Sequence, residues 1–395
     1  MRVCLFTGKG GVGKSTVAAG TAALAAAAGL RTLVLSTDAA HSLGDALDHA
    51  VGAEPTPVAP GLWAQQVDAQ QRFEESWSDV QRYLLAVLDA AGVDAVAAGE
   101  LTVLPGAEEV LALLEVRRQV ETGSPDGGAW DLVVVDCAPT AETLRLLALP
   151  EALGWYMERV LPAERRIVKV LKPVLTRAAG VPMPEDDVFD ALVRLHADLE
   201  EVRRLLTGPD ASVRLVLTPE SVVLAEARRS WTTLSLFGYR VDGVVANRVF
   251  PPTDADDWRA GWVSAQDAVL AEAAESFPGL PLWRSSYAAR EPVGLEALLA
   301  LASALYGDDE PWAAPGAPAP FVVRREAGAP PELRLSLPGA AREEVDLARR
   351  GDELVVTVGS YRRLLALPAG LAGCPVTGAS VTDGELTVRF AERGA

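Results

Sequence analysis

A glycine-rich loop near the N-terminus constrains this chain more than any other feature. Residues 8–16 read GKGGVGKST and lie between a short apolar run, Val3–Phe6, and an alanine-rich stretch, Val17–Ala28. A strand, a GxxxxGK[ST] loop and a helix in this order form a phosphate-binding loop. Glycines let backbone N–H groups turn toward a polyphosphate, and the helix N-terminus adds partial positive charge. The sequence therefore predicts that this loop holds the phosphates of a nucleotide.

The side chains of the loop have predicted roles. Lys14 is expected to reach the β- and γ-phosphates, and the hydroxyl of Ser15 is expected to ligate Mg²⁺. The predicted nucleotide-contacting set is Gly8, Lys9, Gly10, Gly11, Val12, Gly13, Lys14, Ser15 and Thr16. The chain has only four lysines, and Lys9 and Lys14 are two of them. A compact ammonium fits between phosphate oxygens where a planar guanidinium fits poorly.

Composition excludes several classes of protein. The 395 residues carry a formal net charge of −18, which repels nucleic-acid backbones and anionic lipid surfaces. Cys4, Cys137 and Cys374 are too dispersed for a disulfide framework or a zinc-binding CxxC pair. The longest uncharged apolar stretch, Val17–Leu30, is shorter than the roughly 20 residues that span a bilayer. We expect a cytoplasmic protein with no nucleic-acid partner, no membrane insertion and no zinc.

Alternating apolar runs and helical patterns predict an α/β fold. The runs that read as strands apolar on both faces are Val3–Phe6, Thr32–Ser36, Leu132–Val135, Val213–Leu217 and Gly243–Ala246. Such strands are typical of a mostly parallel sheet flanked by helices. The long segments Phe73–Ala98, Ala107–Val120 and Leu153–Leu206 read as mostly helical, which predicts a helical subdomain at roughly 70–125 and 151–210.

One predicted helix carries an apolar stripe with two possible interpretations. The stripe consists of Phe189, Leu192, Leu195, Leu199, Val202 and Leu206. It can face the core of the subdomain, or it can form one wall of a groove that binds a client protein.

The composition changes after Tyr306. Residues 307–320 are rich in proline and alanine and read as a semi-rigid linker, so the preceding domain is expected to cover 1–306. From residue 321 to 395 the apolar period is two, as in Leu333, Leu335 and Leu337, with turn residues between the runs. This spacing predicts a small all-β sandwich.

Two aspartates follow predicted strands at the edge where nucleotides bind. Asp38 follows Thr32–Ser36, and Asp136 follows Leu132–Val135. Ligands of parallel sheets bind at the carboxyl ends of the strands, so both carboxylates are expected near the γ-phosphate. Asp38 would orient the attacking water or bind Mg²⁺ through water, and Asp136 fits the Walker B carboxylate. The predicted metal ligands are Ser15, Asp38 and Asp136, and the predicted catalytic residues include Asp38 and Lys14.

These motifs resemble those of a known family. The loop GKGGVGKST resembles the deviant Walker A loop of the arsenite-pump, septum-site and partition ATPases and of nitrogenase iron protein. Residues 36–43 (STDAAHSL) and 136–147 (DCAPTAETLRLL) resemble the switch segments of the arsenite-pump ATPase and of the tail-anchored-protein targeting ATPase. Further similar motifs are Leu104-Pro105-Gly106, Thr218-Pro219-Glu220 and Val245-Ala246-Asn247-Arg248. The similarity covers about residues 1–306.

The resemblance implies roles that the residues alone do not. It implies that Lys9 reaches across a homodimer interface to the partner's nucleotide, which makes Lys9 a third catalytic residue. It also implies that Asn247 contacts adenine and that Pro281–Glu291 forms the other side of the base pocket. The sequence departs from the family pattern at Ala39, at Ala141-Glu142, and in lacking both the zinc-binding CxxC and the arsenite-binding cysteine trio.

The C-terminal segment resembles the α-crystallin domain of small heat-shock proteins. The matching residues are Leu335–Gly339, Gly351–Leu354, Tyr361–Arg363, Leu367-Pro368 and Ala379–Leu386. Two interpretations remain, a module that binds apolar client segments and a sandwich that only docks within the protein.

The leading hypothesis is a Mg²⁺-dependent ATPase whose dimer opens and closes to control binding of a protein client or ligand. One alternative is a positioning ATPase of the septum-site or partition type, but that class needs a basic DNA-binding face or an amphipathic membrane helix. A second alternative is the ATPase subunit of an anion efflux system, which needs a membrane-protein partner. Electron transfer through an iron–sulfur cluster is disfavoured because Cys4 and Cys374 are poorly placed.

Overall fold

The computed structural model describes residues 1–38, 42–67, 107–138, 186–253, 256–314, 316, 319–325 and 329–391. The chain divides into two compact units, one comprising 1–66, 123–144 and 206–395 and the other 67–122 and 145–205. Several sequence predictions lie outside the described residues, namely the helices expected at 73–98 and 153–185, the motif at 104–106, Ala39, and residues 139–147 of the second switch segment.

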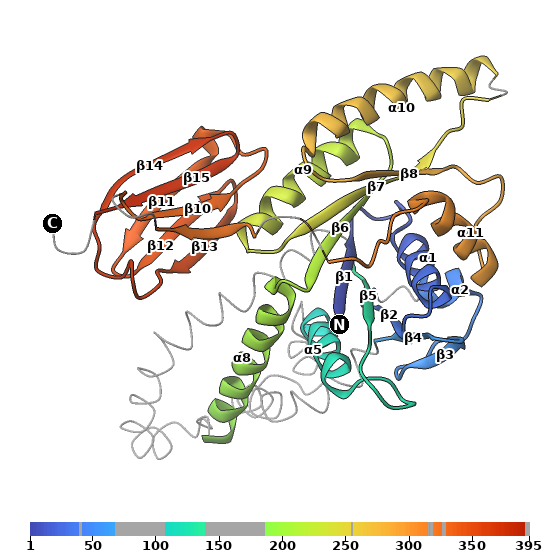
Figure 1. Ribbon diagram of the computed structural model, residues 1–395, viewed down its shortest axis with the longest axis horizontal. Coiled ribbons are helices and arrows are strands. Elements are labelled where there is room, and N and C mark those ends of the chain that lie inside the picture. Colours follow the sequence, from blue (N-terminus) through green and yellow to red (C-terminus); the bar gives the residue numbers. More distant parts are fainter. Residues whose placement is uncertain are drawn as a thin grey trace, which may run out of the picture. The chain divides into compact units, whose positions relative to one another are not determined.

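An eight-stranded sheet forms the centre of the first unit (Figure 1), in the order β3-β4-β2-β5-β1-β6-β7-β8. Its strands are β1 Arg2–Thr7, β2 Thr32–Ser36, β3 Thr56–Ala59, β4 Leu62–Gln66, β5 Leu132–Asp136, β6 Ala211–Leu217, β7 Val241–Val249 and β8 Leu282–Ser286. Every pairing is parallel except that of β3 with β4. The predicted parallel α/β sheet is confirmed, and β3, β4 and β8 are strands that the apolar pattern did not predict.

The central position of β1 follows from its sequence. All six of its residues are buried, which requires neighbours on both edges and cover on both faces. It pairs with β5 on one side and β6 on the other, so the carboxyl ends of these three strands lie at one edge of the sheet. The glycine loop leaves β1 at that edge.

The helices of the first unit are α1 Lys14–Ala27, α2 Ser42–Leu47, α9 Ser221–Leu236, α10 Asp257–Ser276 and α11 Leu295–Tyr306. Figure 1 shows α1 and α11 side by side. Small residues let them approach closely, because a Cβ at Gly20 would lie only 2.9 Å from the carbonyl oxygen of Leu298. This packing holds the helix that follows the glycine loop.

The second unit contains most of α8 Asp186–Thr207 and α5 Ala107–Thr122. Arg117 of α5 donates to Asp198 of α8 at 2.7 Å and also pairs with Glu201. At the C-terminal end of the predicted apolar stripe, Leu199, Val202 and Leu206 are buried. That half of the stripe therefore faces a core, whereas the side chains of Phe189 and Leu192 lie outside the described residues.

The C-terminal strands form two antiparallel sheets. One sheet has the order β14-β15-β10-β9 and the other β11-β12-β13. Their strands are β9 Phe321–Arg324, β10 Glu332–Ser336, β11 Val345–Arg350, β12 Glu353–Val358, β13 Tyr361–Ala366, β14 Val376–Thr382 and β15 Glu385–Phe390. Alternate residues such as Leu333, Leu335, Leu354 and Val356 are buried, as a period of two requires. The predicted all-β region is confirmed.

Side chains of this sandwich contact the C-terminal end of α9. The buried guanidinium of Arg363 donates to the carbonyl oxygen of Leu236, the last residue of α9, and the hydroxyl of Thr232 donates to the carbonyl of Pro338. The rings of Phe237 and Tyr361 meet edge to face at 6.4 Å. A cation at a helix C-terminus satisfies a free carbonyl and interacts favourably with the helix dipole. Arg363 therefore fastens the sandwich to a helix that packs against the large sheet.

Replacing Arg363 by alanine should weaken this attachment. The change leaves the Leu236 carbonyl without its charged donor, which typically costs about 1–3 kcal/mol of unfolding free energy. We expect a lower thermal unfolding midpoint and faster proteolytic cleavage in the segment 312–320. Arg362→Ala is the matched control because the neighbouring Arg362 is exposed. Equal melting and cleavage of the two variants would show that the Arg363 contact does not hold the sandwich.

A buried polar network lies at the opposite edge of the sheet from the glycine loop. Asp242 of β7 accepts hydrogen bonds from Arg2 at 3.0 Å and from Arg214 at 2.8 Å. Arg214 also donates to the hydroxyl of Tyr306 and to the carbonyl oxygen of Pro311, at 3.2 and 2.9 Å. The Tyr306 hydroxyl in turn lies 2.8 Å from the hydroxyl of Thr21 on α1. The network ties the start of the predicted linker to α1 and to the large sheet.

Candidate nucleotide-binding site

The glycine loop adopts the backbone conformation that its sequence predicts. Gly11 and Gly13 have φ values of 80° and 91°, in the left-handed region that favours glycine. A Cβ at Gly13 would lie 2.4 Å from the side-chain nitrogen of Asn247, and a Cβ at Gly8 would lie 2.1 Å from the carbonyl oxygen of Val216. Glycine is therefore required both for the turn and for the close approach of the loop to β6 and β7.

The loop leads directly into α1, which begins at Lys14. Lys14 is buried, and Ser15 places its hydroxyl 2.8 Å from the hydroxyl of Ser42 at the start of α2. Lys9 is half-buried and makes no hydrogen bond or ion pair with the part of the chain that the structure describes. The loop thus offers backbone N–H groups, one buried ammonium and one half-buried ammonium that has no partner among the described residues.

The two predicted carboxylates lie at the ends of neighbouring strands, since β2 pairs with β5 in register from Thr32 and Leu132 to Ser36 and Asp136. The hydroxyl of Ser36 donates to Asp136 at 3.3 Å and accepts from the backbone N–H of Asp38 at 3.2 Å. The Asp38 carbonyl accepts from the amide of Gln66 at 2.8 Å. These bonds hold the backbone of Asp38 beside the Walker B position.

Asp136 is fully buried and electrostatically unusual. Burial raises the pKa of its carboxyl to about 6, and the nearby Asp38 adds to the rise, whereas the Ser15 hydroxyl and the Lys14 ammonium lower it. One carboxylate oxygen, Oδ1, is buried and has no hydrogen-bond partner among the residues that the structure describes. A buried anionic oxygen with no partner is a feature that a hydrated cation would satisfy. The residues present therefore fit Mg²⁺ held between Ser15 and the Asp136 carboxylate.

A cavity of about 280 Å³ lies beside the loop, and its lining includes Thr16, Asn247, Tyr287, Glu291, Pro292 and Leu301. Asn247 donates to the carbonyl of Val12 at 2.9 Å, and Arg248 donates to the carbonyl of Gly11 at 2.9 Å. The structure thus brings Asn247 and part of the segment 281–291 together with the loop. The contact between Arg248 and Gly11 was not predicted. It depends on how β7 is aligned in the sheet relative to the loop, and the two segments are far apart in the sequence.

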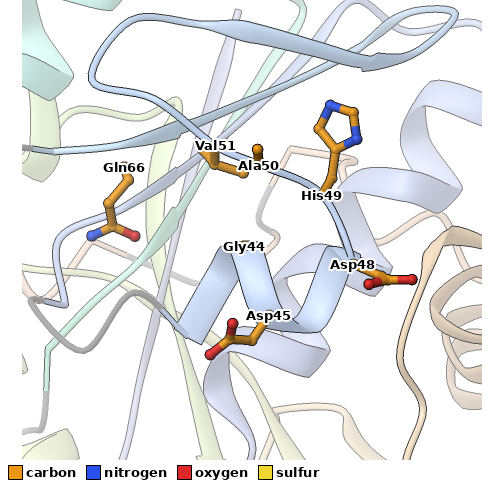
Figure 2. A pocket seen from close by; sticks show the side chains of 7 residues that line it. All are labelled: Gly44, Asp45, Asp48, His49, Ala50, Val51 and Gln66. Atoms are coloured by element: carbon orange, nitrogen blue, oxygen red, sulfur yellow. The ribbon is translucent and has the colours of Figure 1, made fainter.

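A second cavity, of about 480 Å³, lies between α2 with its following loop and the end of β4 (Figure 2). Asp45, Asp48 and His49 line one side, and Gln66 lines the other. No glycine-loop residue borders it, and its two carboxylates would repel a polyphosphate. The smaller cavity, which adjoins the loop, is therefore the better candidate for the nucleotide.

Comparison with known proteins identifies the family. A family model for anion-transporting ATPases matches residues 1–307. The chain belongs to the anion-transporting ATPase family. A second model, an HSP20-like domain found in proteins of this family, matches residues 331–390. The observed α/β sheet and antiparallel sandwich are the folds expected of these two parts.

Relatives of this chain cover nearly its whole length. An uncharacterised protein of Streptomyces coelicolor is 41% identical and covers 99% of this chain and 97% of its own. Proteins of Prosthecochloris vibrioformis and Chlorobaculum tepidum, each provisionally named an arsenical pump-driving ATPase, are 36% identical and cover 99% of this chain and 96% of their own. The similarity therefore includes the sandwich as well as the ATPase domain.

Two negative findings concern the described residues of this ATPase. Within them, no group of three or more His, Cys, Asp or Glu side chains is arranged to hold a metal ion. None of the helices there combines the length and apolarity needed to cross a bilayer. The absence of zinc and of an iron–sulfur cluster remains a prediction.

Proposed function

We propose that this anion-transporting ATPase family member hydrolyses ATP with Mg²⁺ through a deviant Walker A loop, and that its dimer opens and closes to control binding of a client or ligand. The observation that carries the proposal is the convergence of Lys14, Ser15 and Asp136 at the carboxyl edge of the sheet, beside a loop with left-handed glycines. Family membership supports the ATPase chemistry. The dimer and its client are inferences from the sequence motifs.

In the proposed reaction, water attacks the γ-phosphorus, the bond from phosphorus to the β–γ bridging oxygen breaks, and ADP and phosphate leave. Asp38 would accept a hydrogen bond from the water and orient it for in-line attack. Lys14 and backbone N–H groups of the loop would bind the β- and γ-oxygens, where negative charge develops. Mg²⁺, when bound, would neutralise phosphate charge from the Ser15 and Asp136 side.

Lys9 supports a dimer that closes over the nucleotide. Lys14 is buried beneath the loop, whereas Lys9 is only half-buried and unpaired among the described residues. In the resembling families the first lysine of this loop reaches the nucleotide of the partner. We therefore propose the same role for Lys9 in this chain.

ATP should convert an Asp38→Asn protein from monomer to dimer, because bound ATP is not consumed and Lys9 can reach its phosphates. Adding Lys9→Ala should raise the dimer dissociation constant by about tenfold or more, since a buried intersubunit charge contact is lost. Multi-angle light scattering at graded protein concentrations measures both effects. Lys169→Ala is the control, because Lys169 lies outside the loop. A protein that stays monomeric with ATP, or a Lys9 variant that dimerises as well as the control, would contradict the proposal.

A client-handling role is supported by the HSP20-like match at 331–390 and by the attachment of this sandwich to α9. We propose that the sandwich limits or shapes access to an apolar surface of the ATPase. The second candidate, an anion efflux subunit, is favoured by the names given to the relatives of Prosthecochloris vibrioformis and Chlorobaculum tepidum. Stimulation of hydrolysis by arsenite would favour the efflux function, and stimulation by an apolar peptide would favour the client function.

A further inference from the structure

Strand β7 carries a bulge at the residues that contact the phosphate-binding loop. Ala246 of β7 pairs with Arg284 of β8, and Val249 pairs with Ser286, so β7 has one more residue between these partners than β8 has. Arg248 lies inside the bulge with a left-handed φ of 59°, a conformation that residues other than glycine rarely adopt. Bulges and strained residues are over-represented beside active sites, where they re-aim side chains.

A buried side chain of α10 holds this bulge. The amide of Gln266 accepts a hydrogen bond from the backbone N–H of Phe250 at 2.7 Å and donates to the carbonyl of Arg248 at 3.2 Å. Only 5% of Gln266 is exposed. A bulge leaves backbone groups without partners in the sheet, and these two bonds satisfy one donor and one acceptor. The left-handed conformation of Arg248 is therefore fixed from the core side of the strand.

Two consecutive residues of the bulge bind two consecutive carbonyls of the loop. Asn247 donates to the carbonyl oxygen of Val12, and the guanidinium of Arg248 donates to that of Gly11, both at 2.9 Å. A trans peptide group is planar, so its N–H points away from its own C=O. With these two carbonyls held toward β7, the N–H groups of Val12 and Gly13 are directed to the opposite side of the loop.

The direction of these N–H groups decides what the loop can bind. Gly11 and Gly13 have left-handed φ values of 80° and 91°, and α1 begins directly afterwards at Lys14. Successive N–H groups in a turn of this kind form a concavity that binds anions, and the helix N-terminus adds to it. A loop whose peptide groups are already turned loses less conformational entropy when phosphate binds.

We propose that Arg248 is a positioning residue for the nucleotide. Its guanidinium turns the peptide group between Gly11 and Val12 so that the N–H faces the phosphates, and Asn247 does the same for the next peptide group. The bulge and the left-handed backbone serve to aim Arg248 at the loop. This inference rests on the proposed nucleotide-binding function and deepens it, because it names what orients the loop.

Arg248→Gly removes the donor to Gly11 without straining the backbone. Glycine adopts a left-handed φ freely, so the thermal unfolding midpoint should be kept or raised. The dissociation constants for ADP and for a non-hydrolysable ATP analogue should both rise about three- to tenfold, as expected for one lost hydrogen bond. Asparagine also tolerates this conformation and is too short to reach the loop, so Arg248→Asn should behave in the same way.

Two further variants serve as rescue and control. Arg248→Lys keeps a cationic donor on a long side chain and should restore most of the nucleotide affinity. Asp383→Gly is the matched control, because Asp383 also has a left-handed φ, of 50°, but lies in the turn between β14 and β15. It should leave nucleotide affinity unchanged. Equal affinities of the Arg248→Gly, Asp383→Gly and unaltered proteins would overturn the inference.

Relaxation of backbone ¹⁵N nuclei shows whether Arg248 acts through the loop. In the nucleotide-free protein, the order parameters of the Val12 and Gly13 amides should fall in Arg248→Gly and recover in Arg248→Lys. Unchanged order parameters with weakened nucleotide binding would overturn the positioning role and make Arg248 a direct phosphate contact. If the unaltered protein bound neither nucleotide, the proposed nucleotide-binding function would fail, and this inference with it.

Discussion

Asparagine in place of Asp38 should stop ATP turnover while leaving ATP binding intact. The carboxylate is expected to accept a hydrogen bond from the attacking water and orient it, and an amide of the same shape is a weaker acceptor and carries no charge. Loss of such a group typically reduces the rate by about 10²- to 10⁴-fold. The change should spare the backbone, because Asp38 is positioned through its main-chain bonds to Ser36 and Gln66. Single-turnover hydrolysis and equilibrium ATP binding separate the two effects.

Asp45→Asn is the matched control for Asp38→Asn. Asp45 is also an aspartate close to the switch segment, but it lines the larger cavity and has no predicted contact with phosphate. The control should hydrolyse ATP at the rate of the unaltered protein. If Asp38→Asn retained that rate as well, Asp38 would have no part in catalysis and another group would have to orient the water.

Alanine in place of Lys14 should abolish productive nucleotide binding. Lys14 is buried at the first turn of α1, and we expect its ammonium to face the β- and γ-oxygens. Loss of one partner of a buried charge pair costs about 3–5 kcal/mol, which corresponds to an affinity loss of roughly 10²- to 10³-fold or more. Isothermal titration with ATP and Mg²⁺ measures this loss directly.

Lys14→Arg tests whether charge alone is enough. A guanidinium keeps the charge but is planar and larger, so it should restore only a small part of the affinity. Thermal unfolding of each variant without nucleotide checks that the fold is kept. A Lys14→Ala protein that binds ATP as tightly as the original would show that the loop backbone, rather than Lys14, supplies the binding energy.

The sequence predicted the strands that are apolar on both faces and missed those that are not. β4 reads LWAQQ, and Gln65 and Gln66 look like surface residues, yet both are buried. Their burial is tolerated because each side-chain amide donates a hydrogen bond to a carbonyl on another segment. Gln65 donates to the Ala53 carbonyl at 2.6 Å, and Gln66 donates to the Asp38 carbonyl at 2.8 Å. Such long-range hydrogen bonds leave no local pattern. The edge strand β8 was missed because only one of its five residues, Ser285, is buried.

The candidate site also contains residues that the sequence could predict and residues that it could not. Lys14, Ser15, Asp38 and Asp136 could be predicted because each follows a recognisable strand or motif in the chain. The expectation that Asn247 contacts the base came only from the family resemblance, and Arg248 gave no signal of its contact with the loop. A left-handed arginine that bonds a glycine carbonyl more than two hundred residues away results from sheet register, which only a three-dimensional structure supplies.

The buried network around Arg214 sets where the ATPase can be separated from its sandwich. The family match ends at residue 307, yet the Pro311 carbonyl is an acceptor for the fully buried Arg214, and Asp309 accepts from the indole of Trp283 at 2.8 Å. A protein truncated at Tyr306 would lose both acceptors and the part of a cavity wall that Pro311 forms beside Arg214. A protein that contains the ATPase part alone should therefore keep the chain through residue 314. Truncation at the family boundary would instead yield an unstable protein whose low activity could be mistaken for dependence on the sandwich.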